Sequence, residues 1–130
     1  LIKNPQIFNN KVLLSTNLFM DVLSEECSAL VGSIGLIYSA NIGDNFAMFE
    51  PAHGSAPKYA GLDKVNPVAT VLAGAWMLGY LGEPERSAAI FRATERVISE
   101  GKYVTYDLGG NAKLSEMTNA IAKYTAEELK

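Results

Sequence analysis

The stretch AMFEPAHGSAPKYAGLDKVNP, residues 47–67, predicts a strand, a long loop and the start of a helix. Residues 47–50 are apolar enough for a short strand. The loop over residues 51–66 is too long for a simple turn, and loops of this length are usually functional or disordered. At its end Asn66 offers a capping side chain, and the following proline needs no backbone N–H, so we expect a helix over residues 67–81. This helix is apolar on nearly every face, which predicts that it is buried.

Outward from this stretch, predicted helices alternate with short strands. Apolar residues recur at helical spacing over residues 17–31, with Asn17 as the predicted cap and Gly32-Ser33-Ile34-Gly35 as the stop. The other predicted elements are strands over residues 11–16 and 103–106, a turn-rich connection over 36–46, and helices over 83–100 and 113–129. The order is mixed α/β, but so few strands do not complete a sheet. We therefore expect the chain to be part of a longer protein.

Composition excludes several classes of protein. The 130 residues are 48% hydrophobic and 19% charged, which is a globular composition and not a disordered one. Fourteen acidic against 11 basic residues give a net charge of −3 without a basic run, so we expect no nucleic-acid partner. The longest apolar stretch, residues 65–81, is interrupted by polar residues and glycines, so we expect no membrane segment. The single cysteine, Cys27, fits a reducing, cytoplasmic compartment.

Two carboxylates on the first predicted helix are candidates for metal binding. Asp21 and Glu25 are four residues apart, so both side chains leave the same helix face. Like charges at this spacing repel by roughly 0.2–0.5 kcal/mol unless a cation lies between them. Carboxylate oxygens suit Mg²⁺ or Mn²⁺. The alternative is a solvated acidic face, which the neighbouring Glu26 favours.

The loop HGSAPKY, residues 53–59, combines small residues with groups that bind phosphate. Its glycine permits close backbone approach to a ligand. Lys58 offers a positive charge and Tyr59 a hydroxyl. The alternative is a structural hydrogen bond at His53 and a solvated Lys58. Neither G-x-G-x-x-G nor a Walker sequence is present, so the two standard phosphate loops are excluded.

Five segments of the chain together point to a known family. They are NLFMDVLSE (residues 17–25), ANIGD (40–44), FEPAHGSAPKYAG (49–61), DKVNP (63–67) and VTYD (104–107). Together they closely resemble the isocitrate dehydrogenases of the β-decarboxylating dehydrogenase family, which also holds isopropylmalate and homoisocitrate dehydrogenases. The resemblance runs through essentially the whole chain, in family order and spacing, and corresponds to the C-terminal third of such an enzyme.

The resemblance implies an isocitrate/isopropylmalate dehydrogenase-like α/β fold without a Rossmann fingerprint, here only partly covered. Residues 1–31 match the end of the small domain, including a helix of the dimer interface, and residues 32–130 match the C-terminal part of the large domain. The family's substrate cluster and its catalytic tyrosine and lysine lie upstream of the matched part. No catalytic residue is therefore assigned in this chain, and the 130 residues alone are expected to be inactive.

The resemblance also assigns the metal site. Asp21 matches the first aspartate of the family's metal helix, usually written N-L-x-G-D-x-x-S-D, and binds Mg²⁺ or Mn²⁺ together with the substrate. Glu25 stands at the second aspartate, where its extra methylene leaves open a direct contact or one through water. Met20 replaces the usual glycine.

Matched positions likewise assign a dinucleotide site. Their implied contacts are His53 beside the adenosine, Glu50 near the nicotinamide ribose, Gly54, Ser55 and Ala56 around the dinucleotide, Asn66 on the adenine edge and Asp107 beside the adenine. Lys58 and Tyr59 stand where NAD-dependent relatives typically have Asp-Ile, and with Tyr106 they match ligands of the NADP 2′-phosphate. Some NADP enzymes also have an arginine near the position of Gly110, and this chain lacks it.

The resemblance therefore predicts an NADP-dependent isocitrate dehydrogenase of the tricarboxylic acid cycle. The intact enzyme is expected to form 2-oxoglutarate and CO₂ from isocitrate as a cytoplasmic homodimer that uses Mg²⁺ or Mn²⁺. One alternative is an NAD-dependent isocitrate, homoisocitrate or isopropylmalate dehydrogenase. Another, of a different class, is a non-catalytic regulatory subunit or an inactive fragment.

Overall fold

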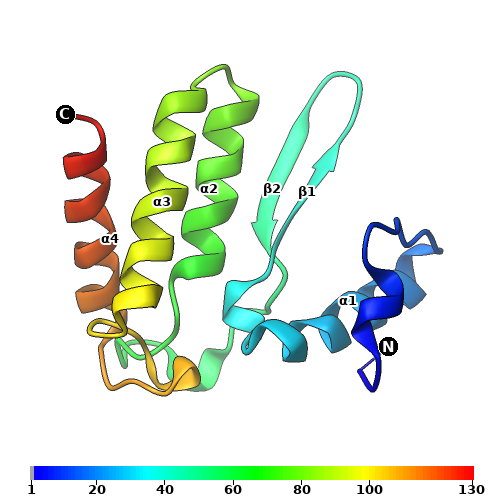
Figure 1. Cartoon of the computed structure of the whole chain (residues 1–130), viewed down its shortest axis with the longest axis horizontal. Coiled ribbons are helices and arrows are strands. Elements are labelled where there is room, and N and C mark those ends of the chain that lie inside the picture. The colour runs from blue at the N-terminus through cyan, green and yellow to red at the C-terminus, as the bar shows by residue number, and fades with distance from the viewer. Residues whose placement is uncertain (1) are drawn as a thin grey trace.

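A computed structural model describes residues 2–130 and contains four α-helices and one two-stranded sheet (Figure 1). In chain order the main elements are α1 (Asn17–Val31), β1 (Tyr38–Ile42), β2 (Ala47–Pro51), α2 (Val68–Tyr80), α3 (Pro84–Glu100) and α4 (Leu114–Glu128). Short 3₁₀ turns lie at η1 (Pro5–Phe8), η2 (Ile34–Leu36), η3 (Pro57–Tyr59) and η4 (Tyr106–Leu108). No helix of the described residues combines the length and apolar character needed to cross a membrane.

Three helices, α2, α3 and α4, form the body of the molecule and hold its core (Figure 1). The core residues that these helices share are Val68, Ala93, Val97, Met117, Ala120 and Ile121. The helix expected over residues 67–81 is buried at its start but not along its whole length, because Trp76 and Tyr80 are 39% and 49% exposed. Its partly exposed end carries aromatic side chains that the β-hairpin covers only in part, since Phe49 lies 5.8 Å from Trp76 and 5.5 Å from Tyr80 between ring centroids.

The sheet is an antiparallel hairpin that packs beside α2. Tyr38 pairs with Pro51 at one end and Ile42 with Ala47 at the other. Edge-on aromatic contacts join the hairpin to Trp76 of α2, at 5.9 Å between ring centroids for Tyr38 and 5.8 Å for Phe49. The hairpin therefore holds the end of β2, where the loop begins, against the body.

The turn-rich connection expected over residues 36–46 is wrong for residues 38–42, which form β1. Ser39 and Asn41 interrupt the apolar pattern, so the segment alone does not predict a strand. Its backbone hydrogen bonds come from pairing with β2, which the local sequence does not show. Only the hairpin loop behaves as a turn, closed by the Gly43 N–H that donates to the Phe46 carbonyl at 3.0 Å.

Two predicted strands do not form. Residues 11–16 are irregular, and Val12 and Leu14 are 94% and 95% exposed, since no strand among residues 2–130 pairs with them. Residues 103–106 form a turn that enters η4, because local bonds replace a ladder: the Leu108 N–H donates to the Thr105 carbonyl at 3.0 Å. In both places the β-rich composition predicted a strand that has no partner to complete it.

The predicted helix ends are confirmed, except that the cap of α1 lies one residue earlier than predicted. Asn17 is the first residue of α1, and Thr16 occupies the cap position. Asn66 does cap α2, since its Oδ1 accepts the Val68 N–H at 2.9 Å. Gly32 ends α1 at φ +109°, a conformation that favours glycine.

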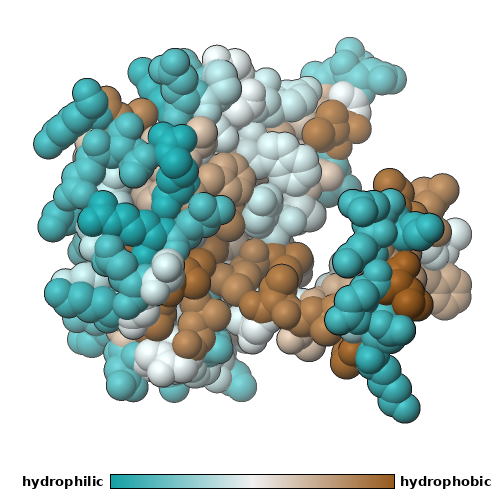
Figure 2. All heavy atoms as spheres, viewed as in Figure 1, coloured by the Kyte–Doolittle hydropathy of each residue, from teal (hydrophilic) through white to brown (hydrophobic). Residues whose placement is uncertain are grey.

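The segment from residue 2 to the end of α1 projects from the body as an arm (Figure 1). Leu18, Phe19 and Val22 of α1 are 70%, 65% and 57% exposed, and Ser28 is the buried residue of this helix. Figure 2 shows hydrophobic side chains gathered on the surface of this arm. The arm therefore presents an apolar face that residues 2–130 leave uncovered.

Candidate cofactor site

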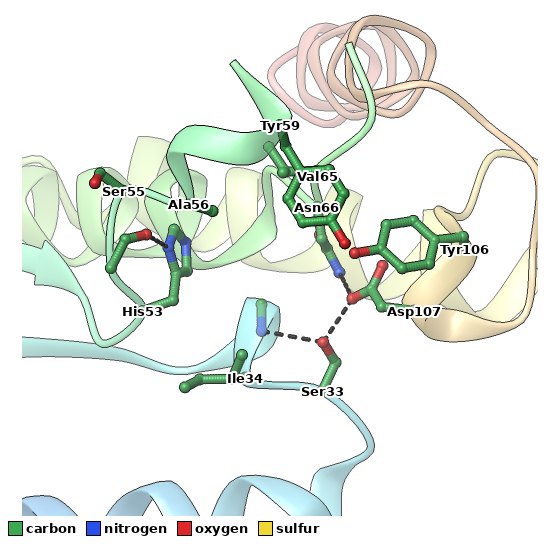
Figure 3. Close-up of a pocket in the computed structure, with 12 residues that line it drawn as sticks. Ser33, Ile34, His53, Ser55, Ala56, Tyr59, Val65, Asn66, Tyr106 and Asp107 are labelled. Carbon is green, nitrogen blue, oxygen red and sulfur yellow. Dashed lines mark hydrogen bonds between the residues drawn. The ribbon is translucent and has the colours of Figure 1, made fainter. Parts of the chain in front are cut away.

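A cavity of about 450 Å³ lies where three segments far apart in the sequence meet (Figure 3). The first segment follows α1, the second is the loop between β2 and α2, and the third is η4. The lining residues are Ser33, Ile34, Gly35, His53, Gly54, Ser55, Ala56, Tyr59, Val65, Asn66, Tyr106 and Asp107. Eight of the residues predicted to bind the cofactor are thus brought together.

Asp107 joins the three segments through its carboxylate. Its Oδ2 accepts hydrogen bonds from Ser33 Oγ at 2.5 Å and from Asn66 Nδ2 at 2.9 Å, and its Oδ1 accepts one from Thr105 Oγ1 at 2.6 Å. Burial by itself raises the pKa of Asp107, but the bonds from Ser33, Thr105 and Asn66 outweigh it, so this pKa lies below its ordinary value. The carboxylate is therefore held ionised, at the wall of the cavity.

Asn66 has two structural bonds in addition to its predicted role at the adenine edge. Its side chain caps α2 and donates to Asp107, and the residue is 7% exposed. One amide hydrogen and one lone pair remain for a ligand. Contact with an adenine stays a prediction that this arrangement allows.

Three residues of the site, Ser33, Gly35 and Thr105, were not predicted from the sequence. Residues 32–35 were interpreted only as the end of a helix, yet Ser33 bonds both Asp107 and the Gly35 N–H. A Cβ on Gly35 would lie 2.9 Å from Asn66 Cβ, so only glycine lets this turn approach the loop. The Gly-Ser-Ile-Gly stretch at residues 32–35 was the available signal, but the residues that it bonds are distant in sequence.

His53 gives the clearest indication that a ligand belongs here. Its Nδ1 lies 3.0 Å from the Gly54 carbonyl oxygen. Its Nε2 is buried and has no hydrogen-bond partner within residues 2–130. Buried polar atoms are almost always paired, so this ring nitrogen fits a polar group of a bound nucleotide.

Two tyrosines, Tyr59 and Tyr106, lie beside one another at the cavity with their hydroxyls turned together (Figure 3); we call them the tyrosine pair. Their ring centroids are 6.4 Å apart. Lys58 Nζ lies 4.9 Å from the Tyr59 ring centroid, and Lys64 Nζ lies 4.7 Å and 5.6 Å from the Tyr106 and Tyr59 ring centroids. The pair thus combines two hydroxyls with two ammonium groups.

The pKa values of the two tyrosines are shifted in opposite directions. Hydrogen bonding from Tyr106 is the largest cause that lowers the pKa of Tyr59, and the positive charges of Lys58 and Lys64 lower it further. The same contact with Tyr59 raises the pKa of Tyr106. The charges of Lys58 and Lys64 therefore favour an anion at the Tyr59 hydroxyl, which is a suitable environment for an anionic ligand.

Lys58 and Glu50 are not among the residues that line the cavity. Lys58 is exposed beside the tyrosine pair. Glu50 lies on β2, where its Oε1 accepts a hydrogen bond from Asn41 Nδ2 at 3.1 Å. The structure therefore brings Lys58 to the edge of the predicted site and leaves Glu50 on the hairpin.

The predicted metal ligands, Asp21 and Glu25, are both exposed on α1, away from the cavity. Within residues 2–130 no cluster of three or more His, Cys, Asp or Glu side chains could hold a metal ion. Two carboxylates suit a hard cation such as Mg²⁺ or Mn²⁺, but such a cation is usually coordinated by about six oxygen atoms. The two side chains would therefore supply only part of the coordination shell of such a cation.

Comparison with known proteins identifies the family of the chain. The family described as isocitrate/isopropylmalate dehydrogenase matches residues 1–121 of the chain. The chain belongs to this family. The homoisocitrate dehydrogenase of Methanocaldococcus jannaschii is 45% identical over 130 residues, which are 100% of this chain and 37% of that protein. The probable mitochondrial NAD isocitrate dehydrogenase subunit alpha of Drosophila melanogaster is 46% identical over 93% of this chain and 32% of its own length.

A solved structure agrees with the family assignment. The crystal structure of isocitrate dehydrogenase from Methylococcus capsulatus matches with a TM-score of 0.90 and 42% identity, over 95% of this chain and 37% of that one. The expected isocitrate/isopropylmalate dehydrogenase α/β fold is therefore confirmed. The chain spans about a third of the length of the curated relatives named here. The boundary at residue 31 and the roles of the individual site residues stay predictions.

Proposed function

We propose that this chain is the C-terminal, cofactor-binding part of an NADP-dependent isocitrate dehydrogenase. The complete enzyme oxidises and decarboxylates isocitrate to 2-oxoglutarate and CO₂. The observation that carries the NADP assignment is the tyrosine pair with Lys58 beside it. The family as a whole uses a nicotinamide cofactor and a divalent metal.

Lys58 and the tyrosine pair form a site for a phosphate and not for a neutral ribose. Two phenols donate hydrogen bonds, and Lys58 supplies a charge 4.9 Å from the Tyr59 ring. Charge-assisted hydrogen bonds of this kind contribute about 1.5–3 kcal/mol each. NAD carries a hydroxyl where NADP carries the 2′-phosphate, so it gains none of this. No carboxylate stands at position 58 to repel the phosphate or to hold ribose hydroxyls.

The rest of the cavity fits the adenosine part of the same cofactor. The unpaired Nε2 of His53 requires a polar partner, and Asp107 is held ionised where an adenine amino group would donate. Gly54, Ser55 and Ala56 keep the loop small enough for close approach. A cofactor held by this cavity would supply a hydride acceptor, and a metal held by Asp21 and Glu25 would supply positive charge to stabilise the substrate oxygen.

On the arm, Asp21 and Glu25 are proposed to bind Mg²⁺ or Mn²⁺. The exposed apolar face of α1 is proposed as a homodimer contact, since Leu18, Phe19 and Val22 would be buried there. We place the enzyme in the cytoplasm on the basis of its single, unpaired cysteine.

A sister dehydrogenase is the second candidate. The Methanocaldococcus relative is named a homoisocitrate dehydrogenase, and the Drosophila relative is named for NAD. Both names favour another substrate or cofactor over those proposed here. A regulatory subunit is a further alternative, against which the eight predicted residues gathered at one cavity argue.

Steady-state assays of the complete enzyme separate these candidates. Isocitrate, homoisocitrate and 3-isopropylmalate would each be supplied with NADP and with NAD. We expect the highest kcat/KM for isocitrate with NADP. The double variant Lys58→Asp, Tyr59→Ile should reverse the cofactor preference, because the new carboxylate repels the 2′-phosphate and holds ribose hydroxyls. A wild-type preference for NAD, or for another substrate, would contradict the proposal, and no turnover with any pair would favour the regulatory subunit.

A further inference from the structure

We propose that Lys64 is a second cation for the 2′-phosphate and a specificity-determining residue of this enzyme. The inference rests on the proposed NADP function. Under this proposal two lysines, Lys58 before Tyr59 in the loop and Lys64 after it, neutralise the negative charge of the phosphate, and not Lys58 alone.

The position of Lys64 is the first argument. Its Nζ lies 4.7 Å from the Tyr106 ring centroid and 5.6 Å from that of Tyr59, whereas Lys58 contacts Tyr59 only. Lys64 is therefore the cation that lies near both members of the tyrosine pair. Neither lysine forms an ion pair with a carboxylate of residues 2–130, so both charges are available to an anion.

The backbone of Lys64 is fixed on both sides. The preceding Asp63 accepts the Ser115 N–H at 2.8 Å and Ser115 Oγ at 2.6 Å through its carboxylate, and its carbonyl accepts the Leu114 N–H at 2.9 Å. Two residues after Lys64, Asn66 is held by α2 and Asp107. The loop is thus anchored to two helix starts, and Lys64 is presented from a short, tethered span.

The position of Gly110 gives an independent argument. A Cβ there would lie 2.1 Å from the Val104 carbonyl oxygen, which is backbone and cannot rotate away. The Gly110 N–H also donates to the Thr105 carbonyl at 3.1 Å. A cationic side chain therefore cannot approach the tyrosine pair from this position, whereas Lys64 already lies beside both rings.

The electrostatics of the tyrosine pair agree with this geometry. After the hydrogen bond from Tyr106 and the effects of Lys58, the charge of Lys64 also lowers the pKa of Tyr59. A field that favours a phenolate favours a bound phosphate for the same reason. Loss of Lys64 is therefore expected to weaken binding of a 2′-phosphate and leave the binding of the adenosine part unchanged.

The test measures ligand affinity of the complete enzyme without substrate or metal. Calorimetry would give the Kd of 2′,5′-ADP and of 5′-AMP for wild type, Lys64→Met and Lys64→Arg. We expect wild type to bind 2′,5′-ADP more tightly than 5′-AMP. In Lys64→Met the ratio of the two Kd values should fall roughly tenfold, as expected for the loss of one charge-assisted contact. In Lys64→Arg the ratio should stay as in wild type. The Kd of 5′-AMP should be the same in all three, which shows that the cavity is intact.

Lys102→Met is the matched control. Lys102 Nζ lies 5.0 Å from the Tyr103 ring centroid, which is the same kind of contact outside the cavity. Its removal should leave the affinity ratio unchanged. A second, ligand-free readout is the phenol titration at 295 nm with Tyr59→Phe as reference: Lys64→Met should raise the pKa of Tyr59, and Lys102→Met should not.

The outcomes distinguish the inference from the function on which it rests. A wild-type enzyme that binds 2′,5′-ADP and 5′-AMP equally would overturn both the NADP assignment and the role of Lys64. A wild-type preference that persists fully in Lys64→Met would overturn the role of Lys64 and leave the NADP assignment intact. If Lys64→Met weakens 5′-AMP as well, Lys64 supports the loop and does not select the phosphate.

Discussion

The arm and the body of this molecule contain amphipathic helices of equal length, α1 and α4, that differ in how much of their apolar face is buried. Over 15 residues, α4 buries Met117, Ala120 and Ile121. Over 15 residues, α1 buries only Ser28 and leaves Leu18 70% exposed. Hydrophobic periodicity therefore predicts both helices equally well, but it does not say whether the covering surface belongs to the same segment of chain.

The two regions also divide the proposed chemistry. The cofactor cavity lies where the loop, η2 and η4 meet beside the body, whereas Asp21 and Glu25 lie on the arm. Binding of the cofactor should therefore depend on the body, and metal-assisted catalysis on the arm and its partners. Mutations in the two regions should separate these properties.

The largest effect is expected for Asp21→Asn in the complete enzyme. Loss of a charged metal ligand removes several kcal/mol of transition-state stabilisation, so kcat should fall by at least ~100-fold. Glu25→Gln should do less harm, because Glu25 already departs from the family's aspartate. Both variants should keep the wild-type Kd for 2′,5′-ADP. A near-normal kcat of Asp21→Asn at ordinary Mn²⁺ concentrations would remove Asp21 from the metal site.

Core truncation tests the body against the arm directly. Met117 is fully buried, so Met117→Ala should lower the free energy of unfolding by about 2–5 kcal/mol. Leu18→Ala in the same 130-residue chain should change it by less than about 0.5 kcal/mol, since Leu18 is 70% exposed. Urea unfolding of both variants gives the comparison, and equal losses would show that the arm is packed in solution.

The exposed face of α1 should respond to charge in the complete enzyme. Val22 is 57% exposed in this chain, and Val22→Glu should weaken a homodimer that buries it by at least roughly tenfold, from the cost of placing a charge in an apolar contact. Ile98→Glu is the control on α3, where Ile98 is 36% exposed. Sedimentation velocity measures the dimer constant. A dimer that tolerates Val22→Glu would place the interface elsewhere.

Acid should weaken the body through Asp107. Its pKa in the folded protein lies below the unfolded value of about 3.9, so its contribution is present above about pH 4 and is lost as the pH falls through the folded-state pKa. Asp107→Asn should cost about 1 kcal/mol at neutral pH, and the difference from wild type should shrink below pH 4. Urea unfolding between pH 3 and pH 7 measures it. A difference that is constant with pH would contradict the role of the charge.

The sequence predicted the helices because their signals are local. Caps and stops such as Asn66 and Gly32 act within a few residues, and all four long helices were found within one or two residues of their ends. Strands depend on a partner, which is why β1 was missed and residues 11–16 were wrongly predicted as a strand. Burial also depends on a partner. The apolar end of α2 was predicted to be buried, but Trp76 and Tyr80 there are partly exposed.

The candidate site divides in the same way. The loop that holds His53, Tyr59 and Asn66 is contiguous in sequence and was identified from its composition and its resemblance to the family. Ser33 and Thr105 were missed because the bonds that tie them to the site go to Asp107, which is 74 residues from Ser33 and two from Thr105. Side chains that bond to other site residues leave little trace in a single sequence.

Hydrogen–deuterium exchange of the complete enzyme tests the division between body and arm most directly. NADP alone should slow exchange in residues 53–59 and 104–110 and leave residues 17–31 unchanged. Further addition of Mn²⁺ and isocitrate should then slow exchange in residues 17–31. Protection of residues 17–31 by NADP alone, with residues 53–59 and 104–110 unaffected, would contradict the placement of the cofactor in this cavity.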